Sequence, residues 1–327
     1  MSTDRIPLVS ILEARRRVAG LVERTACVVS PTLSERAQAP VHLKMEHRQT
    51  TGSFKLRGAS NAIASLCGEE RALGVVTAST GNHGRALAFA AAREGIPAII
   101  CMSELVPENK VSEIGRLGAD IRIVGKSQDD AQREVDRLVA DKGLTMVPPF
   151  DAEAVIAGQG TLGLEIIEDV PDAACVVVPL SGGGLIAGIA SAVKTVNPDV
   201  RIVGVSMERG PAMRASLDAG QPVQVEEQSS LADSLGGGIG LDNRFTFSIC
   251  RALVDEVILL TEDEIAAGIR HAYAIEREVL EGAGAVGIGA LLAGKLSVTG
   301  PTVLVLSGRN IDMAAHRAII SAGEGEA

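Results

Sequence analysis

The chain has 327 residues, and 46% of them are hydrophobic, which is enough for a large buried core and for about two domains of ordinary size. Its formal net charge is −10, and it contains no Trp, one Tyr and five Phe. Nucleic-acid binders need basic patches and, for single strands, aromatic stacking platforms. The composition therefore argues against nucleic acid as a partner and favours a small-molecule substrate.

Several absences in the sequence bear on where the protein works. No run of 18 apolar residues is present, so no membrane span is expected. The first five residues lack the charged-then-apolar form of a signal peptide. The five cysteines are odd in number, widely spaced and without a CxxC pair, so we expect buried, reduced thiols and no metal site. A cytoplasmic location follows from these points.

Short apolar runs alternate with amphipathic stretches of helical length over residues 72–148. Such alternation predicts a parallel sheet covered by helices. We expect strands at residues 75–77, 98–101, 121–124 and 144–147, and helices at residues 84–94, 111–117 and 129–141.

A second series of the same type follows Pro148-Pro149-Phe150. Residues 175–178 are continuously apolar, as in a central parallel strand covered on both faces, and residues 201–205 and 302–306 repeat the pattern. The sequence therefore predicts an α/β protein of two domains. We expect the large domain to comprise residues 1–71 and 149–327, and the small one residues 72–148.

A lysine follows a small, glycine-containing turn in the segment Thr51-Gly52-Ser53-Phe54-Lys55-Leu56-Arg57-Gly58. Lysine forms Schiff bases with carbonyl compounds when burial or a neighbouring positive charge lowers its pKa. A lysine in a first helical turn is more often a solvated surface residue. Taken alone, this segment is compatible with either role.

Two turns offer backbone N–H groups at the start of a predicted helix. Ser79-Thr80-Gly81-Asn82-His83-Gly84 suits a carboxylate ligand, but it also suits a plain polar helix cap. Ser181-Gly182-Gly183-Gly184-Leu185 follows a buried strand, and three glycines let backbone N–H groups surround a phosphate. The latter turn also fits a loose dinucleotide pattern, Gly182-x-Gly184-x-x-Ala187. No acidic residue stands at the tip of the next strand, so a nicotinamide-dependent dehydrogenase is the weaker alternative.

A fourth turn, Leu306-Ser307-Gly308-Arg309-Asn310, ends another apolar strand. Ligands of open α/β sheets bind beyond the carboxyl ends of the strands, so Ser307 should face the same crevice as the other turns. An ordinary glycine turn is the alternative.

Together the four segments resemble the fold-type II pyridoxal-phosphate enzymes of the threonine dehydratase and serine racemase group. The resemblance runs from about Leu8 to Asp312, and the Ser-Phe-Lys-x-Arg-Gly segment is its most specific part. It implies a tryptophan synthase β-like fold, pyridoxal 5'-phosphate as cofactor, an amino-acid substrate and a homodimer.

The resemblance also implies roles for individual residues. Lys55 would hold the cofactor covalently, with Phe54 beside the ring, and would then act as the base at the substrate α-carbon. The expected cofactor-binding residues are Phe54, Lys55, Asn82, Gly182, Gly183, Gly184, Leu185, Glu281 and Ser307. The expected substrate-binding residues are Ser79, Thr80, Gly81, Asn82, His83 and Arg309.

The implied reaction is elimination of water from a β-hydroxy amino acid, giving a 2-oxo acid and ammonia. Ser307 supports it, because a neutral hydroxyl at the pyridine nitrogen makes the ring a weaker electron sink than a carboxylate would. Thr80 stands where serine racemases carry a catalytic serine, so racemisation is the alternative.

Some positions depart from the group's pattern. Arg309 replaces a glycine of the usual Ser-Gly-Gly-Asn, and it would either bind an extra acceptor of the substrate or point outward. Glu208 stands two positions later than the glutamate that holds a divalent cation in serine racemases, so no metal is expected. We expect His47 to be a surface residue. The His47-Arg48 and Arg309 segments are similar to those of the hydroxyectoine-utilisation dehydratases, a specialised catabolic branch.

Overall fold

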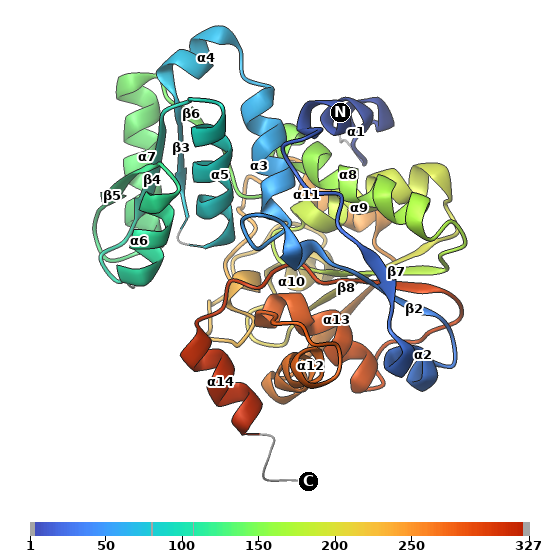
Figure 1. Ribbon diagram of the computed structural model, residues 1–327. Helices are drawn as coiled ribbons and strands as arrows, with labels where there is room; N and C mark the ends of the chain where they lie inside the picture. Colours follow the sequence, from blue (N-terminus) through green and yellow to red (C-terminus); the bar gives the residue numbers. More distant parts are fainter. Residues whose placement is uncertain (1–3, 80, 107, 323–327) are drawn as a thin grey trace.

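The computed structural model describes residues 4–79, 81–106 and 108–322 and contains two sheets flanked by helices (Figure 1). A six-stranded sheet has the order β1-β2-β10-β7-β8-β9. Only β1 is antiparallel to its neighbour, and the other strands of that sheet pair in parallel. A four-stranded parallel sheet has the order β5-β4-β3-β6.

The elements alternate along the chain as expected for parallel sheets. The strands are β1 (Cys27–Val29), β2 (Val41–Lys44), β3 (Val75–Ala78), β4 (Ala98–Met102), β5 (Asp120–Ile123), β6 (Thr145–Met146), β7 (Cys175–Pro179), β8 (Arg201–Met207), β9 (Glu256–Leu260) and β10 (Thr302–Val305). The α-helices are α1 (Leu8–Val18), α2 (Pro31–Ala37), α3 (Lys55–Ala64), α4 (Gly68–Leu73), α5 (Asn82–Arg93), α6 (Glu108–Arg116), α7 (Gln128–Lys142), α8 (Glu153–Asp169), α9 (Gly184–Val196), α10 (Ala212–Ala219), α11 (Thr246–Leu253), α12 (Glu262–Ala274), α13 (Gly282–Leu292) and α14 (Met313–Ser321). Two short 3₁₀ helices are η1 (Glu46–Arg48) and η2 (Asp233–Leu235).

The large sheet is buried on both faces because successive side chains of a strand point in opposite directions. Val176 and Val178 of β7 pack into a core shared with α1, α8, α9 and α11. Val177 of the same strand packs into the opposite core with α12 and α13. This two-sided burial explains why the central strands are continuously apolar.

The small sheet is covered in the same way. Val75 and Ile100 face a core that includes α3, α5 and α6, whereas Val76 and Cys101 face α7. Helix α7 begins with a capping box in which the Ser127 hydroxyl accepts from the N–H of Asp130. In Figure 1 this sheet lies beside α3, whose C-terminal end leads through α4 into β3 of the small sheet.

The predicted α/β class is confirmed, with boundaries that differ by a few residues. The predicted strand at 144–147 is only two residues long, and β1, β2 and β9 were not predicted. The expectation for the cysteines was partly wrong. All five are free thiols, but Cys67 is exposed and Cys27 is only half-buried. Among the described residues, no helix is long and apolar enough to cross a membrane.

Candidate active site

Lys55 is the first residue of α3, and one hydrogen bond to a backbone carbonyl orients its side chain. Its Nζ donates to the carbonyl oxygen of Pro149 at 2.6 Å and lies 5.3 Å from the centre of the Phe54 ring. Burial lowers the pKa of Lys55 to about 8, although the negative charge of Glu281 acts in the opposite direction. A substantial fraction of the amine is therefore neutral near pH 8, as a nucleophile or base requires.

The segment that holds Lys55 also packs against the glycine turn before α9. A Cβ on Gly182 would lie 2.5 Å from the Phe150 ring, and one on Gly184 would lie 2.9 Å from Phe150 Cβ. Gly183 has φ +88°, a left-handed conformation that favours glycine. Pro149 and Phe150 thus lie between Lys55 and the glycine turn, which places the two predicted sites next to each other.

The first turn of α5 carries two buried polar side chains. His83 is 3% exposed, and its Nε2 lies 2.9 Å from the carbonyl oxygen of Val147. Since a carbonyl only accepts, Nε2 carries the proton and Nδ1 is the acceptor. Burial, reinforced by the nearby charge of Lys55, lowers the pKa of His83 to about 3. His83 is therefore neutral, and its side chain can offer an anion no charge.

Asn82 belongs to a closed set of hydrogen bonds with Glu281 and Asn310, which we call the amide–carboxyl ring. Asn82 Nδ2 donates to Glu281 Oε1 at 2.7 Å, and the Asn310 N–H donates to Glu281 Oε2 at 3.1 Å. Asn310 Nδ2 closes the ring by donating to Asn82 Oδ1 at 2.5 Å. Burial and then the charge of Asp233 raise the pKa of Glu281 to about 7. The ring joins α5 to the loops before α13 and after β10.

Ser307 is buried next to the lysine segment. Its carbonyl accepts from the Phe54 N–H at 3.0 Å, and Ser53 forms an isolated bridge with Gly308. The Ser307 hydroxyl has no hydrogen-bond partner among the described residues. It is available to a ligand. Arg309, the next residue but one, has an exposed side chain.

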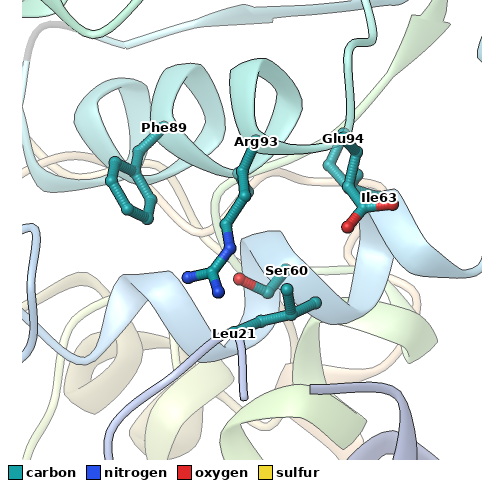
Figure 2. Close-up of a pocket in the computed structure, with 7 residues that line it drawn as sticks. Leu21, Ser60, Ile63, Phe89, Arg93 and Glu94 are labelled. Atoms are coloured by element: carbon teal, nitrogen blue, oxygen red, sulfur yellow. The ribbon is translucent and has the colours of Figure 1, made fainter. Parts of the chain in front are cut away.

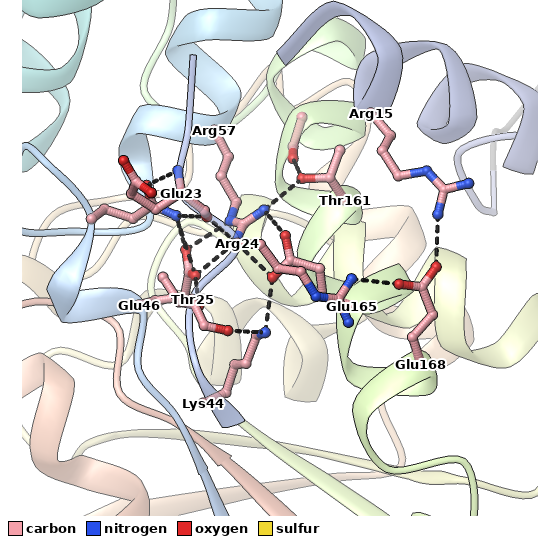
Figure 3. Close-up of polar contacts among 12 residues, drawn as sticks. Arg15, Glu23, Arg24, Thr25, Lys44, Glu46, Arg57, Thr161, Glu165 and Glu168 are labelled. Carbon is pink, nitrogen blue, oxygen red and sulfur yellow. Dashed lines mark hydrogen bonds and ion pairs between the residues drawn. The ribbon is translucent and has the colours of Figure 1, made fainter. Parts of the chain in front are cut away.

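A buried charged cluster fixes α3 just beyond Lys55 (Figure 3). We call Arg57, Glu46, Glu165 and Lys44 the guanidinium cluster. Arg57 bonds both oxygens of Glu46 at 2.8 Å and both oxygens of Glu165 at 2.7 and 3.0 Å. Lys44 Nζ lies 2.8 Å from Glu165. Two bidentate pairs hold the guanidinium in a single orientation, which in turn holds the helix that begins at Lys55.

Helices α3 and α5 pack side by side, and a shallow pocket marks their contact away from Lys55 (Figure 2). Ser60 and Ile63 of α3 and Phe89 and Arg93 of α5 line it. None of the predicted site residues does. This contact brings the first turns of the two helices to the same end of the helix pair.

Comparison with known proteins identifies the family to which this chain belongs. The model of the family described as "Pyridoxal-phosphate dependent enzyme" matches residues 18–308. The chain belongs to this family. It is 62% identical to a Sinorhizobium fredii protein named "Putative threonine dehydratase", over 97% of this chain and 96% of that protein. It is 44% identical to an L-threonine ammonia-lyase of Thermotoga maritima, over 97% of this chain and 79% of that protein. The solved structure of maize serine racemase superimposes with a TM-score of 0.90 at 32% identity, covering 97% of both chains.

The residues present fit pyridoxal phosphate. The N–H groups of Gly182 and Gly183 have no acceptor among the described residues, and the first turn of α9 adds further free N–H groups. Together they form a cradle for a phosphate, aided by the helix dipole. The Lys55 amine, with its lowered pKa, can attack the carbonyl carbon of the cofactor as a nucleophile. The free Ser307 hydroxyl can form a hydrogen bond with the ring nitrogen of the cofactor. The predicted cofactor is confirmed by the family.

Sequence reasoning missed several residues of this pyridoxal-phosphate enzyme. His47 was expected at the surface, which is wrong: it is 1% exposed, and its Nε2 bonds Glu278 at 2.7 Å. The roles of Asn310, Pro149 and Phe150 were not foreseen. Thr80 lies outside the described residues.

Proposed function

We propose that the chain eliminates water and ammonia from threonine or a related β-hydroxy amino acid, giving a 2-oxo acid. The observation that carries this proposal is the partly neutral Lys55 beside a free phosphate cradle and a free Ser307 hydroxyl. The names of the two curated relatives, a threonine dehydratase and an L-threonine ammonia-lyase, support the reaction and the substrate class.

The proposed cofactor contacts divide among four loops. Lys55 and Phe54 hold the cofactor at its reactive carbon and ring face, Gly182, Gly183, Gly184 and Leu185 hold its phosphate, Asn82 its ring hydroxyl, and Ser307 its ring nitrogen, with Glu281 nearby. Bound pyridoxal phosphate supplies an electron sink for the bonds at the substrate α-carbon. Since Ser307 is neutral, that sink is moderate, which favours early loss of the β-hydroxyl over reactions that need a long-lived carbanion.

Lys55 is the proposed base at the α-carbon. With a pKa of about 8, its amine can accept a proton near neutral pH and return it later. The Pro149 carbonyl accepts a hydrogen bond from this amine and fixes its direction. The neutral His83 ring offers the substrate carboxylate no positive charge, and its one N–H is already bonded to Val147. The carboxylate is therefore held by the N–H groups and hydroxyls of the turn at residues 79–83, for which Thr80 is a candidate.

Three further predictions accompany this function. Residues 72–148 form a small domain, and residues 1–71 and 149–327 form the large one. The protein is a cytoplasmic homodimer. The exposed Arg309 binds a polar or acidic end of the substrate, as a specialised dehydratase such as one of hydroxyectoine utilisation would need.

A product assay on purified protein loaded with pyridoxal phosphate tests the proposal. We expect ammonia and a 2-oxo acid from at least one member of a panel of β-hydroxy amino acids, and no visible cofactor band or product with Lys55→Ala. Lys126→Ala, an exposed lysine, is the matched control and should behave as wild type. Formation of the D-isomer without 2-oxo acid would instead assign racemisation, the activity named for the maize structure.

A further inference from the structure

The orientation of the Asn82 amide is set by a chain of hydrogen bonds that begins at a backbone carbonyl. Asn310 Nδ2 donates to the carbonyl oxygen of Thr51 at 2.9 Å. That carbonyl can only accept, so the group of Asn310 that faces it must be the NH2 and not the oxygen. The second hydrogen of the same NH2 points to Asn82.

The same reasoning passes to the next amide. Because Asn310 donates to Asn82, the Asn82 atom that it meets must be Oδ1. The Asn82 NH2 group is then directed to the other side, where it donates to Glu281. A single backbone carbonyl of the lysine segment thus decides which face of Asn82 is a donor.

We propose that Asn310 is a positioning residue that holds Asn82 with its NH2 group toward the cofactor site. This inference rests on the proposed role of Asn82 as the partner of the ring hydroxyl of the cofactor. Without Asn310, the Asn82 amide can turn over and present its oxygen, an acceptor, where a donor is needed.

Two glycines, Gly52 and Gly308, let the backbone pass close to the side chains of the amide–carboxyl ring. Gly52 has φ +79°, and a Cβ there would lie 3.0 Å from Asn310 Cγ. A Cβ on Gly308 would lie 2.9 Å from the Glu281 carboxyl carbon and 3.4 Å from Asn82 Nδ2. A side chain at either position would overlap the amide–carboxyl ring, which fills the space next to both glycines.

The ring is also tied rigidly to Lys55. The Arg309 N–H donates to Gly52 O at 2.9 Å, and the Phe54 N–H donates to Ser307 O at 3.0 Å. These two bonds run between the segment that ends at Lys55 and the segment that ends at Asn310. Asn310 therefore keeps a fixed place relative to the lysine, which a positioning role requires.

Binding of pyridoxal phosphate alone tests the inference, with Asn310→Ala and the isosteric Asn310→Asp, each in the wild-type and in the Asn82→Ala background. Loss of one oriented hydrogen bond is expected to raise the dissociation constant of the cofactor about three- to tenfold for Asn310→Ala. Asn310→Asp puts an acceptor opposite Asn82 Oδ1 and should weaken binding further. In the Asn82→Ala background either change should matter less than about twofold, because coupled residues are not additive.

The visible band of the lysine-bound cofactor provides a second readout. Its pH midpoint should shift in Asn310→Asp and not in the control Asn197→Ala, an exposed residue at the end of α9. Equal losses of affinity in both backgrounds would overturn the positioning role. Since no amino acid is present, this outcome is independent of the proposed reaction, which fails separately if wild type releases no 2-oxo acid.

Discussion

Two buried polar clusters near Lys55 differ in how their carboxyl groups are stabilised. In the guanidinium cluster, Arg57 meets two carboxylates bidentately and Lys44 adds a second positive charge. In the amide–carboxyl ring, a single carboxyl, Glu281, is held between two neutral amides and forms no ion pair with any described residue.

The difference appears in their protonation. Burial acts to raise the pKa of Glu46, but the charge and hydrogen bonds of Arg57 outweigh it and lower that pKa. The carboxylates raise the pKa of Arg57 against the opposing effect of burial. At Glu281 burial prevails and the pKa rises to about 7. The Arg57–Glu46 pair is therefore a frame that stays ionised, whereas Glu281 of the ring titrates in the range in which an enzyme works.

Removing the cation of the frame should have the largest effect on stability. In Arg57→Met the buried Glu46 loses its bidentate partner and Glu165 keeps only Lys44, so we expect the free energy of unfolding of the cofactor-free protein to fall by about 3–5 kcal/mol in urea at pH 7. Arg137→Met removes an exposed arginine paired within α7 and should cost less than about 1 kcal/mol. A similar small loss for both variants would contradict the view of the guanidinium cluster as a frame.

Glu281→Gln should remove the titration of the ring. A carboxyl whose pKa is raised from 4.5 to about 7 binds its proton more tightly when folded. Its contribution is complete below pH 4.5 and is lost as the pH rises through about 7, for a total of about 3 kcal/mol at 1.36 kcal/mol per pKa unit. Wild type should lose this stability between about pH 4.5 and 7, and Glu281→Gln should not.

The control for that comparison is Glu69→Gln, an exposed residue of α4. It should keep the wild-type slope of unfolding free energy against pH. Parallel slopes for wild type and Glu281→Gln would show that the ring does not titrate in this range. Cofactor-free protein is the sample, so that cofactor binding does not add its own pH dependence.

The two clusters also show which features of the site can be predicted from the sequence and which cannot. The three glycine turns and Lys55 were found because each is a local pattern, a few residues long, at the boundary of a strand and a helix. Alternating apolar runs predicted the parallel sheets for the same reason. Local patterns do not say which distant side chains meet. The partners of Arg57 lie 11 and 108 residues away, and Asn310 lies 228 residues from Asn82.

Errors in the prediction have the same physical origin. His47 looked like a surface residue because polar neighbours flank it, but Glu278, 231 residues away, satisfies its ring in the interior. Strands β1 and β9 lie at the two edges of the large sheet, where burial is partial and the apolar signal is weak. Strand β2 is mostly buried, but His42 and Lys44 interrupt its apolar pattern. Asn310 was overlooked beside Arg309, whose charge is conspicuous in the sequence although its side chain is exposed.

Crowding the ring should have an intermediate effect. In Gly308→Ala the new methyl group meets the Glu281 carboxyl and approaches Asn82 Nδ2. We expect unfolding free energy to fall by about 1–3 kcal/mol, as is usual for an overpacked core, and the cofactor to bind more weakly. Gly68→Ala, at a helical position with open space around its Cβ, is the control and should be neutral or slightly stabilising. An unchanged cofactor affinity in Gly308→Ala would mean that the ring tolerates displacement.

Arg309 lies between Gly308, which borders the ring, and Asn310, which belongs to it, yet the Arg309 side chain is exposed and should contribute least to stability. Arg309→Ala should change the free energy of unfolding by less than about 0.5 kcal/mol. If the guanidinium binds a distal acceptor of the substrate, the same variant should lower kcat/KM for β-hydroxy amino acids with an acidic end and leave threonine nearly unaffected. Arg133→Ala, on the exposed face of α7, should alter neither quantity. An equal change for both substrate types would assign Arg309 to the surface and leave substrate choice to the turn at residues 79–83.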